Sequence, residues 1–218
     1  GGLAQHAARH HGVRVTGITV SREQQLLAEQ RCAGLPVSIR PQDYRDLEGR
    51  YDRIVSVGMF EHVGINHYRA YFERVRELLA DDGAALIHFI ARADVPAATN
   101  PFIARYIFPG GYIPAMSEVL PAIEASGLIV TDVEVLRLHY ALTLRHWRER
   151  FLAHWAEAAS LKGERFCRMW EFYLITAEMM FRTGSQQVFQ MQLTRQPDAA
   201  PLSRDYMVDL QREYLRRA

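Results

Sequence analysis

The sequence is almost without lysine: Lys162 is the single lysine among 26 basic residues, so arginine supplies nearly all of the positive charge. These bases are balanced by 25 acidic residues, and a net charge of +1 gives no long-range attraction for nucleic acid. The two cysteines, Cys32 and Cys167, form no CxxC pair, which is typical of a reducing compartment without a disulfide framework. The histidines lack the spacing of zinc ligands, and we expect no metal site.

Long apolar segments and common nucleotide or hydrolase motifs are also absent. No apolar run approaches the ~18 residues of a membrane span, and no signal-peptide region follows the N-terminus, so we expect a cytoplasmic protein. The lack of a phosphate-binding GxxxxGK[ST] run and of a GxSxG elbow argues against nucleotide phosphates and acyl hydrolysis. A composition of 49% hydrophobic and 23% charged residues is that of a globular chain and excludes a disordered one.

The first 135 residues alternate β-branched runs with amphipathic stretches, which predicts βαβ units on a mainly parallel sheet. The clearest helical stripe lies within residues 64–80 and the most apolar strand within residues 84–90. We predict further strands at residues 13–20, 37–40, 52–58, 128–136 and 187–194, and further helices at residues 21–33, 117–126, 141–159 and 164–182.

Between these elements, residues 91–115 carry four of the nine prolines and the aromatic run YIFPGGYIP, which predicts a lid or binding loop. We expect one domain over residues 1–195. The tail, residues 196–218, is polar and interrupted by proline, so we expect it to dock loosely or fray.

Polar residues follow three of the predicted strands, where an open parallel sheet binds its ligands. They lie within residues 19–24, 42–44 and 58–62, and His88 lies inside an apolar strand. Each also has a purely structural explanation. Ser21 and Gln24 fit a capping box, Glu61 suits the first turn of a helix, and a lone His88 is more often a hydrogen-bonded core histidine. The aromatic side chains of the late helices are more often core than substrate lining.

Several longer runs, taken together, resemble the cyclopropane-fatty-acyl-phospholipid synthase family, which includes the mycolic acid cyclopropane synthases. The runs that carry this resemblance are VTGITVSREQQLLAEQRC, QDYRDLEGRYDRIVSVGMFEHVG, LIHFIARAD, YIFPGGYIP and HYALTLRHWRERF. They are spread over about residues 1–192. Where family members more often have threonine, this chain has Phe89, a change beside the expected backbone contact of Ile90.

The resemblance implies an α/β fold, the Rossmann-like sheet of class I S-adenosylmethionine (SAM)-dependent methyltransferases, with a helical lipid-binding insertion. Family members carry a glycine-rich loop after a first strand, and this chain begins at the last two glycines of that loop, Gly1 and Gly2. We therefore expect an N-terminally incomplete domain that lacks the first strand, binds SAM poorly and has little activity by itself.

The resemblance also implies the site residues. A bicarbonate ion, serving as general base, is expected at Glu61, His88, the backbone of Ile90 and Tyr140, of which the three side chains are the catalytic candidates. The family's SAM contacts match Gly1, Gly2, Thr19, Gln24, Asp43, Tyr44, Val57 and Gly58. The implied reaction adds a methylene group to the cis double bond of an unsaturated phospholipid acyl chain.

Two other functions stay open at this point. The chain is also similar to SAM-dependent methyltransferases that add a methyl branch to an acyl chain or methylate an amine, and an inactive lipid-binding relative is the third reading. Access to lipid favours transient contact with the inner membrane face through Arg145, Arg148 and Arg150, although these arginines fit an ordinary solvated helix face equally well. The sequence is compatible with a homodimer and does not indicate one.

Overall fold

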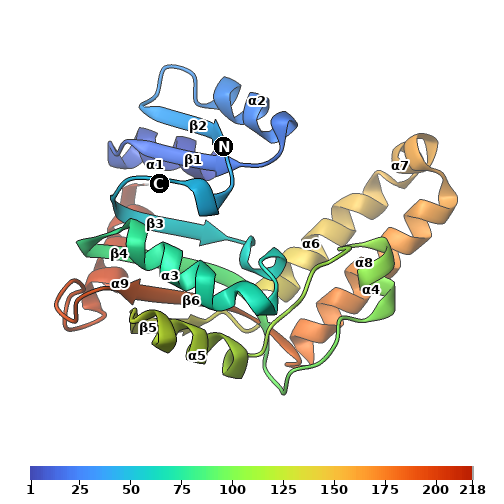
Figure 1. Ribbon diagram of the computed structural model, residues 1–218. Helices are drawn as coiled ribbons and strands as arrows, with labels where there is room; N and C mark the ends of the chain where they lie inside the picture. Colours follow the sequence, from blue (N-terminus) through green and yellow to red (C-terminus); the bar gives the residue numbers. More distant parts are fainter. Residues whose placement is uncertain (218) are drawn as a thin grey trace. The chain divides into compact units, whose positions relative to one another are not determined.

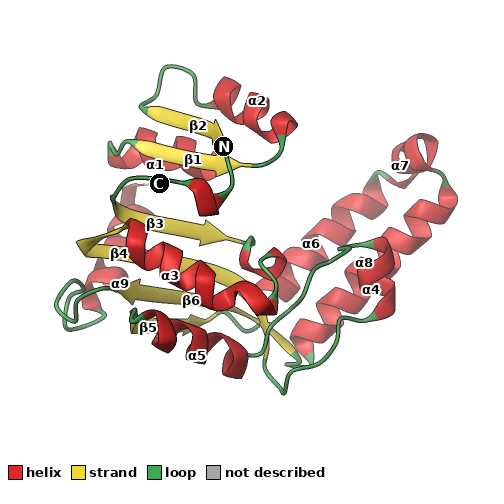
Figure 2. Ribbon diagram, viewed as in Figure 1, coloured by secondary structure: helices red, strands yellow, loops and turns green. Residues whose placement is uncertain are grey.

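The chain contains both strands and helices in a computed structural model that describes residues 1–217 (Figures 1 and 2). The chain forms two compact units, Gly1–Gly49 and Arg50–Ala218, and each is described here by itself. The expected single domain over residues 1–195 stays a prediction.

The first unit contains two parallel strands and two helices. Its elements are α1 (Gly2–His11), β1 (Val15–Thr19), α2 (Arg22–Arg31), β2 (Val37–Pro41) and the 3-10 helix η1 (Tyr44–Asp46). Ser21 caps α2 as predicted, because its hydroxyl accepts the backbone N–H of Gln24 at 3.3 Å. Because β1 and β2 are parallel, their carboxyl ends lie side by side. There the backbone N–H of Gln42 donates to the carbonyl of Thr19 at 3.1 Å.

The second unit is built on a four-stranded mixed sheet in the order β3-β4-β6-β5. The strands are β3 (Tyr51–Val57), β4 (Leu79–Arg92), β5 (Ile129–Val135) and β6 (Gln186–Thr194). β3 runs parallel to β4, whereas β6 is antiparallel to both of its neighbours. Helices α3 (Tyr68–Leu78) and α5 (Met116–Ser126) cover one face of this sheet (Figure 1).

The central strand β4 separates the core from the candidate site by strict alternation of its side chains. Ile87, Phe89 and the residues two positions before and after this pair are fully buried. Phe89 packs on a cluster of aromatic rings, some of which belong to α3. His88 and Ile90 point to the opposite face and are half-buried. Along the sheet, His88 lies opposite Val57 of β3 on one side and opposite Gln190 of β6 on the other.

A helical insertion interrupts the sheet strands along the chain. It consists of α4 (Pro101–Tyr106) after β4, and of α6 (His139–Ala153), α7 (Trp155–Lys162) and α8 (Glu164–Arg182) between β5 and β6, with α6 and α8 side by side (Figure 2). α4 lies in the segment expected to be loop, because the Asn100 side chain accepts the N–H of Phe102 at 2.9 Å and starts a helix at Pro101. The helix predicted at 141–159 is broken at His154. Among residues 1–217, no helix has the length and apolar character needed to cross a membrane.

The C-terminal tail differs from the expectation of loose docking. It forms helix α9 (Asp205–Arg217), and two contacts tie its start to the sheet. The Gln192 amide nitrogen on β6 donates to the hydroxyl of Tyr206 at 2.8 Å, and Arg204 pairs with Asp132 of β5 at 2.6 Å. Polar side chains on β5 and β6 thus hold the start of the tail in place. The proline content of the tail gives no information about these contacts.

Candidate functional site

The chain turns sharply between β3 and α3, and this turn carries Glu61. Gly58 follows β3 with a φ of 66°, a left-handed conformation that favours glycine. Its N–H donates to the carbonyl of His88 at 3.0 Å, so the end of β3 is fixed to β4. The 3-10 helix η2 (Phe60–His62) comes directly after it and places Glu61 beside the sheet.

Phe60 anchors this turn in the core. Its side chain is fully buried, and its ring centroid lies 4.4 Å from that of Tyr68, 5.0 Å from that of Phe89 and 5.4 Å from that of Phe72. Ring pairs at these separations stabilise a core beyond the area that they bury. The position of Glu61 is therefore determined by the aromatic core beneath it and not by a flexible loop.

The carboxyl group of Glu61 is the most unusual group in the second unit. One oxygen, Oε1, accepts the backbone N–H of Ile90 at 2.8 Å, whereas Oε2 is buried and has no hydrogen-bond partner among residues 1–217. Burial raises the pKa of Glu61, and the hydrogen bond from Ile90 opposes part of this rise. A buried polar atom without a partner is costly in a folded protein and indicates a place for a ligand.

Two tyrosines, Tyr68 and Tyr140, lie in electrostatic range of this carboxyl group, and Tyr173 lies in range of Tyr140. The buried hydroxyl of Tyr68 has no hydrogen-bond partner among the described residues, and burial together with the Glu118 and Glu61 carboxylates raises its pKa. Burial raises the pKa of Tyr140 as well, and the charge on Glu61 adds to this rise. Burial raises the pKa of Tyr173 to about 12, with a smaller contribution from Tyr140. These phenols are therefore neutral near pH 7 and available as hydrogen-bond donors.

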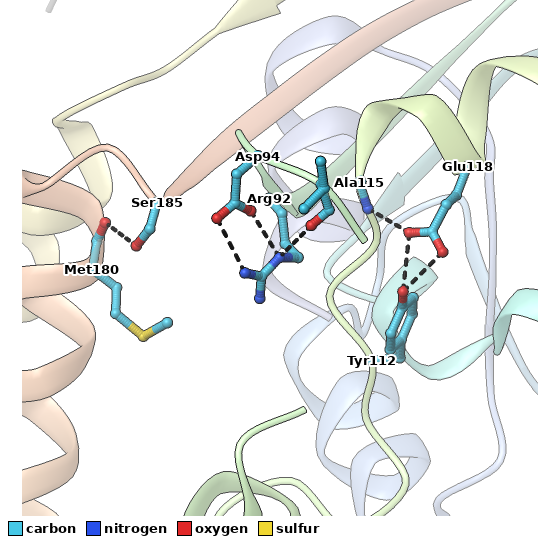
Figure 3. A network of polar contacts seen from close by, with 8 residues as sticks. Arg92, Asp94, Tyr112, Ala115, Glu118, Met180 and Ser185 are labelled. Atoms are coloured by element: carbon cyan, nitrogen blue, oxygen red, sulfur yellow. Dashed lines mark hydrogen bonds and ion pairs between the residues drawn. The ribbon is translucent and has the colours of Figure 1, made fainter. Parts of the chain in front are cut away.

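The segment from 106 to 114, predicted as a binding loop, is tied to Glu61 through the backbone of Tyr112. The side chain of Tyr112 belongs to a polar network with Glu118 and Ala115 (Figure 3). The backbone N–H of Tyr112 donates to the carbonyl of Glu61 at 2.9 Å. The Tyr112 hydroxyl donates to the Glu118 carboxylate at 2.8 Å, and the same carboxylate accepts the N–H of Ala115 at 2.7 Å. Tyr112 therefore connects both the loop and Glu61 to Glu118 at the start of α5.

Among the residues that the structure describes, the His88 ring has one hydrogen-bond partner. Its Nδ1 lies 3.1 Å from the amide nitrogen of Gln190 on the adjacent strand, and burial lowers the pKa of the imidazole. A lowered pKa makes His88 a neutral ring near pH 7.

Tyr140 lies in the first turn of α6, against the apolar cluster of the helical insertion. Its ring centroid is 5.1 Å from that of Phe181 and 5.9 Å from that of Trp147. The late aromatic residues divide between two roles: Tyr173 and Phe181 are buried, whereas Phe172 is 53% exposed and Trp147 is 40% exposed. Core packing thus accounts for some of them and leaves others free to contact a ligand.

The remaining SAM candidates lie in the first unit, apart from Val57 and Gly58 at the end of β3. The Thr19 hydroxyl donates to the Gln24 side-chain oxygen at 2.9 Å. The Asp43 carboxylate accepts two hydrogen bonds from the Arg45 guanidinium, each at 2.9 Å, which lowers the pKa of Asp43. Gly1 packs so closely on α2 that a Cβ there would lie 2.8 Å from Ala28. Gly2 begins α1, and Tyr44 begins η1.

The structure thus brings together Thr19 with Gln24 in the first unit and Glu61 with Ile90 in the second, with Tyr140 in electrostatic range of Glu61. Sequence reasoning missed three supporting residues, Tyr68, Glu118 and Gln190. Tyr68 looked like one more apolar position of a helical stripe, and Glu118 like an ordinary first-turn acid. A glutamine within the apolar run VFQMQL was the available signal for Gln190.

The raised pKa of Glu61 predicts a pH-dependent stability effect for Glu61→Gln. In the pH range just above the usual glutamate value of 4.5, folded Glu61 keeps a proton that the unfolded chain has lost. The free energy of unfolding therefore falls as pH rises through this range, and glutamine removes that loss. We expect urea unfolding to show Glu61→Gln gaining stability over the wild type between about pH 4 and about pH 8. A difference that does not change with pH, or that matches the exposed control Glu124→Gln, would contradict the assignment.

Comparison with known proteins identifies relatives of this chain. The family described as mycolic acid cyclopropane synthetase matches residues 1–191. The cyclopropane-fatty-acyl-phospholipid synthase of Escherichia coli is 42% identical over 195 residues, which cover 89% of this chain and 51% of that protein. The tuberculostearic acid methyltransferase of Mycobacterium tuberculosis is 40% identical over 199 residues, covering 87% of this chain and 47% of the relative.

A solved structure gives the same result for the fold. The crystal structure of a mycolic acid cyclopropane synthase complexed with SAH and CTAB superposes with a TM-score of 0.79 at 31% identity. The match covers 86% of this chain and 72% of that protein. The expected α/β methyltransferase fold is confirmed, whereas this chain spans only about half the length of the curated relatives it matches.

Proposed function

Because the chain belongs to the mycolic acid cyclopropane synthetase family, we propose that it is part of an enzyme that transfers a methylene group from SAM to the cis double bond of an unsaturated phospholipid acyl chain, forming a cyclopropane ring. The observation that carries this proposal is the Glu61 carboxyl group, which is buried, held by Ile90 and unpaired at Oε2. Burying a carboxyl oxygen without a hydrogen-bond partner costs free energy, and a ligand bound at Oε2 would remove this cost.

The residues at this site fit a small anion such as bicarbonate. Glu61 with a raised pKa can supply a proton to a hydrogen bond at Oε2, and the neutral hydroxyl of Tyr140 can supply another. His88 contributes a neutral ring from the same strand that carries Ile90. The N–H of Ile90 donates to Glu61 in this structure, so its expected contact with the anion stays a prediction.

The residues that fit SAM lie at carboxyl ends of strands. Thr19 and Gln24 follow β1, Asp43 and Tyr44 follow β2, and these polar groups suit the ribose and adenine of a nucleoside. Gly58, which follows β3, leaves open space where a side chain would stand. When bound, SAM supplies an electrophilic methyl group, and bicarbonate supplies a base.

This chain's own side chains would exclude water and stabilise positive charge. An alkene is a weak nucleophile, and methyl transfer to it leaves a cationic lipid chain that must lose a proton for the ring to close. The faces of Tyr140, Phe181 and Trp147 lie together and can stabilise a cation. The Glu61 carboxyl group is buried and lies in electrostatic range of Tyr140, so it is shielded from bulk water.

The apolar cluster beside Tyr140 is the proposed acyl site. It is bordered by partly buried apolar side chains of β4 and the helical insertion, among them Ile90, Phe102, Ile103, Ile107 and Trp170. Such a lining is typical of sites for apolar ligands. The related structure that contains CTAB, a single-chain amphiphile, supports a lipid chain as the substrate class.

A second product is supported by one of the relatives. The tuberculostearic acid methyltransferase adds weight to a simple methyl branch in place of a ring. The test is to supply the protein as it occurs naturally with SAM and monounsaturated phospholipid vesicles and to analyse the products by mass spectrometry and proton NMR. We expect ring-methylene protons of a cyclopropane. A branch-methyl signal without them would select the second product, and no alkylated lipid at all would overturn both.

Contact with the membrane surface is a further part of this proposal. In α6, Arg145 pairs with Glu149 at 3.1 Å and Arg148 lies 4.0 Å from Glu178, whereas Arg150 has no ion pair among residues 1–217. An unpaired arginine near the half-exposed Trp147 suits a transient contact with anionic lipid. Vesicle sedimentation is the measurement, and Arg150→Glu is expected to weaken binding to anionic vesicles. A homodimer of this chain stays a prediction.

A further inference from the structure

The strand β6 places a glutamine directly across from the candidate histidine. Gln190 and His88 are register partners of β6 and β4, and residues opposite each other in an antiparallel pair project from the same face. The amide nitrogen Nε2 of Gln190 lies 3.1 Å from Nδ1 of His88. Nε2 of the His88 ring has no partner among residues 1–217.

With the NH₂ group of Gln190 facing the ring, this contact favours one of the two ring nitrogens as the carrier of the proton. An amide NH₂ group can only donate, so the Nδ1 that faces it must accept and must be unprotonated. Burial lowers the pKa of His88, so the ring is neutral and its single proton lies on the other nitrogen. The hydrogen bond at one nitrogen of a histidine commonly fixes the function of the other in this way.

We propose that Gln190 is a positioning residue that fixes His88 as the Nε2–H tautomer, so that the ring presents a hydrogen-bond donor to the anion held at Glu61. The role of the anion rests on the proposed function, whereas the tautomer and its dependence on Gln190 do not.

The surroundings of Gln190 support a specific role for its amide. Its neighbours along β6, Phe189 and Met191, are buried, and a polar group in such a strand is costly unless it is hydrogen-bonded. Gln192, two residues further along the same face, uses its amide differently: it donates to Tyr206 and accepts from the hydroxyl of Thr131 at 3.0 Å. Gln192 therefore provides a matched control on the same strand and face.

The direct test is nitrogen-15 NMR of histidine-labelled protein near neutral pH, where the shifts of Nδ1 and Nε2 report the tautomer. In the wild type we expect His88 as the Nε2–H form. Gln190→Ala should give a mixture of both tautomers, and Gln192→Ala should leave the wild-type form unchanged. A wild-type ring protonated at Nδ1, or an unchanged tautomer in Gln190→Ala, would overturn the proposal.

A kinetic measurement separates this inference from the proposed function. In the naturally occurring protein, Gln190→Ala is expected to lower kcat by up to about 100-fold with little change in KM for lipid, because the reacting groups are misplaced and not lost. Equal loss in the Gln192→Ala control would indicate a general structural effect and overturn the positioning role. Absence of any alkylating activity in the wild type would defeat the proposed function, while the NMR result would still decide the role of Gln190.

Discussion

Replacing Glu61 with glutamine is expected to lower the rate of lipid alkylation and ring closure by about 100- to 10,000-fold, the range over which a positioned acid or base contributes to catalysis. Glutamine keeps the size of the side chain, and its carbonyl oxygen can still accept the N–H of Ile90. What it removes is the titratable group whose second oxygen is buried without a partner. The measurement is the initial rate of cyclopropane formation by the protein as it occurs naturally.

Two observations make this result decisive. Glu124→Gln, a change of the same chemistry at an exposed position of α5, should retain the wild-type rate. Urea unfolding should show that Glu61→Gln is folded and that its stability relative to the wild type increases from about pH 4 to about pH 8. A folded Glu61→Gln protein with a rate within a few-fold of the wild type would mean that this carboxyl group has no part in the reaction.

Phe60→Ala is expected to produce the largest loss of stability. A fully buried phenylalanine replaced by alanine typically costs about 3–5 kcal/mol, because apolar contacts are lost and the cavity closes only partly. Phe60 contacts aromatic rings from both α3 and β4, so the surrounding core has little freedom to collapse. Urea unfolding followed by tryptophan fluorescence reports this unit, since all three tryptophans lie in its helical insertion.

The matched control is Phe172→Ala. Phe172 also contacts an aromatic ring, that of Phe102 at 5.1 Å, but its side chain is 53% exposed. Its loss should therefore cost much less than that of Phe60. Equal effects of the two substitutions would contradict the assignment of Phe60 as the anchor of the turn that carries Glu61.

Local sequence patterns predict the elements of this fold well where periodicity and pairing agree. The helix expected at residues 164–182 matches α8, because a long apolar stripe with helical spacing is compatible with a helix and not with a strand. The helical stripe predicted within residues 64–80 and the strand predicted within residues 84–90 leave a connection between them, and this was wrong. The chain instead enters β4 at Leu79, since Leu79 pairs with Tyr51 of β3 and strand pairing overrides the local turn preference.

The site was less predictable than the fold. Composition and spacing alone leave Glu61 undecided, favour a capping role for Gln24 and favour a core role for His88. The family resemblance assigns all three to the site and so reverses the expectation for Gln24 and His88. The burial that raises the pKa of Glu61 is a property of the folded unit, which no local pattern describes. The same is true of the Gln190 contact with His88, which joins residues 102 positions apart.

The alternation of β4 has a consequence for how such a protein can change over evolutionary time. Inserting or deleting one residue before Ile87 would turn Phe89 outward and send His88 into the aromatic interior, so the fold and the chemistry would fail together. Heritable variation in this strand is thereby restricted to substitutions, and new specificities must arise from the helices and loops that border the exposed side of the strand.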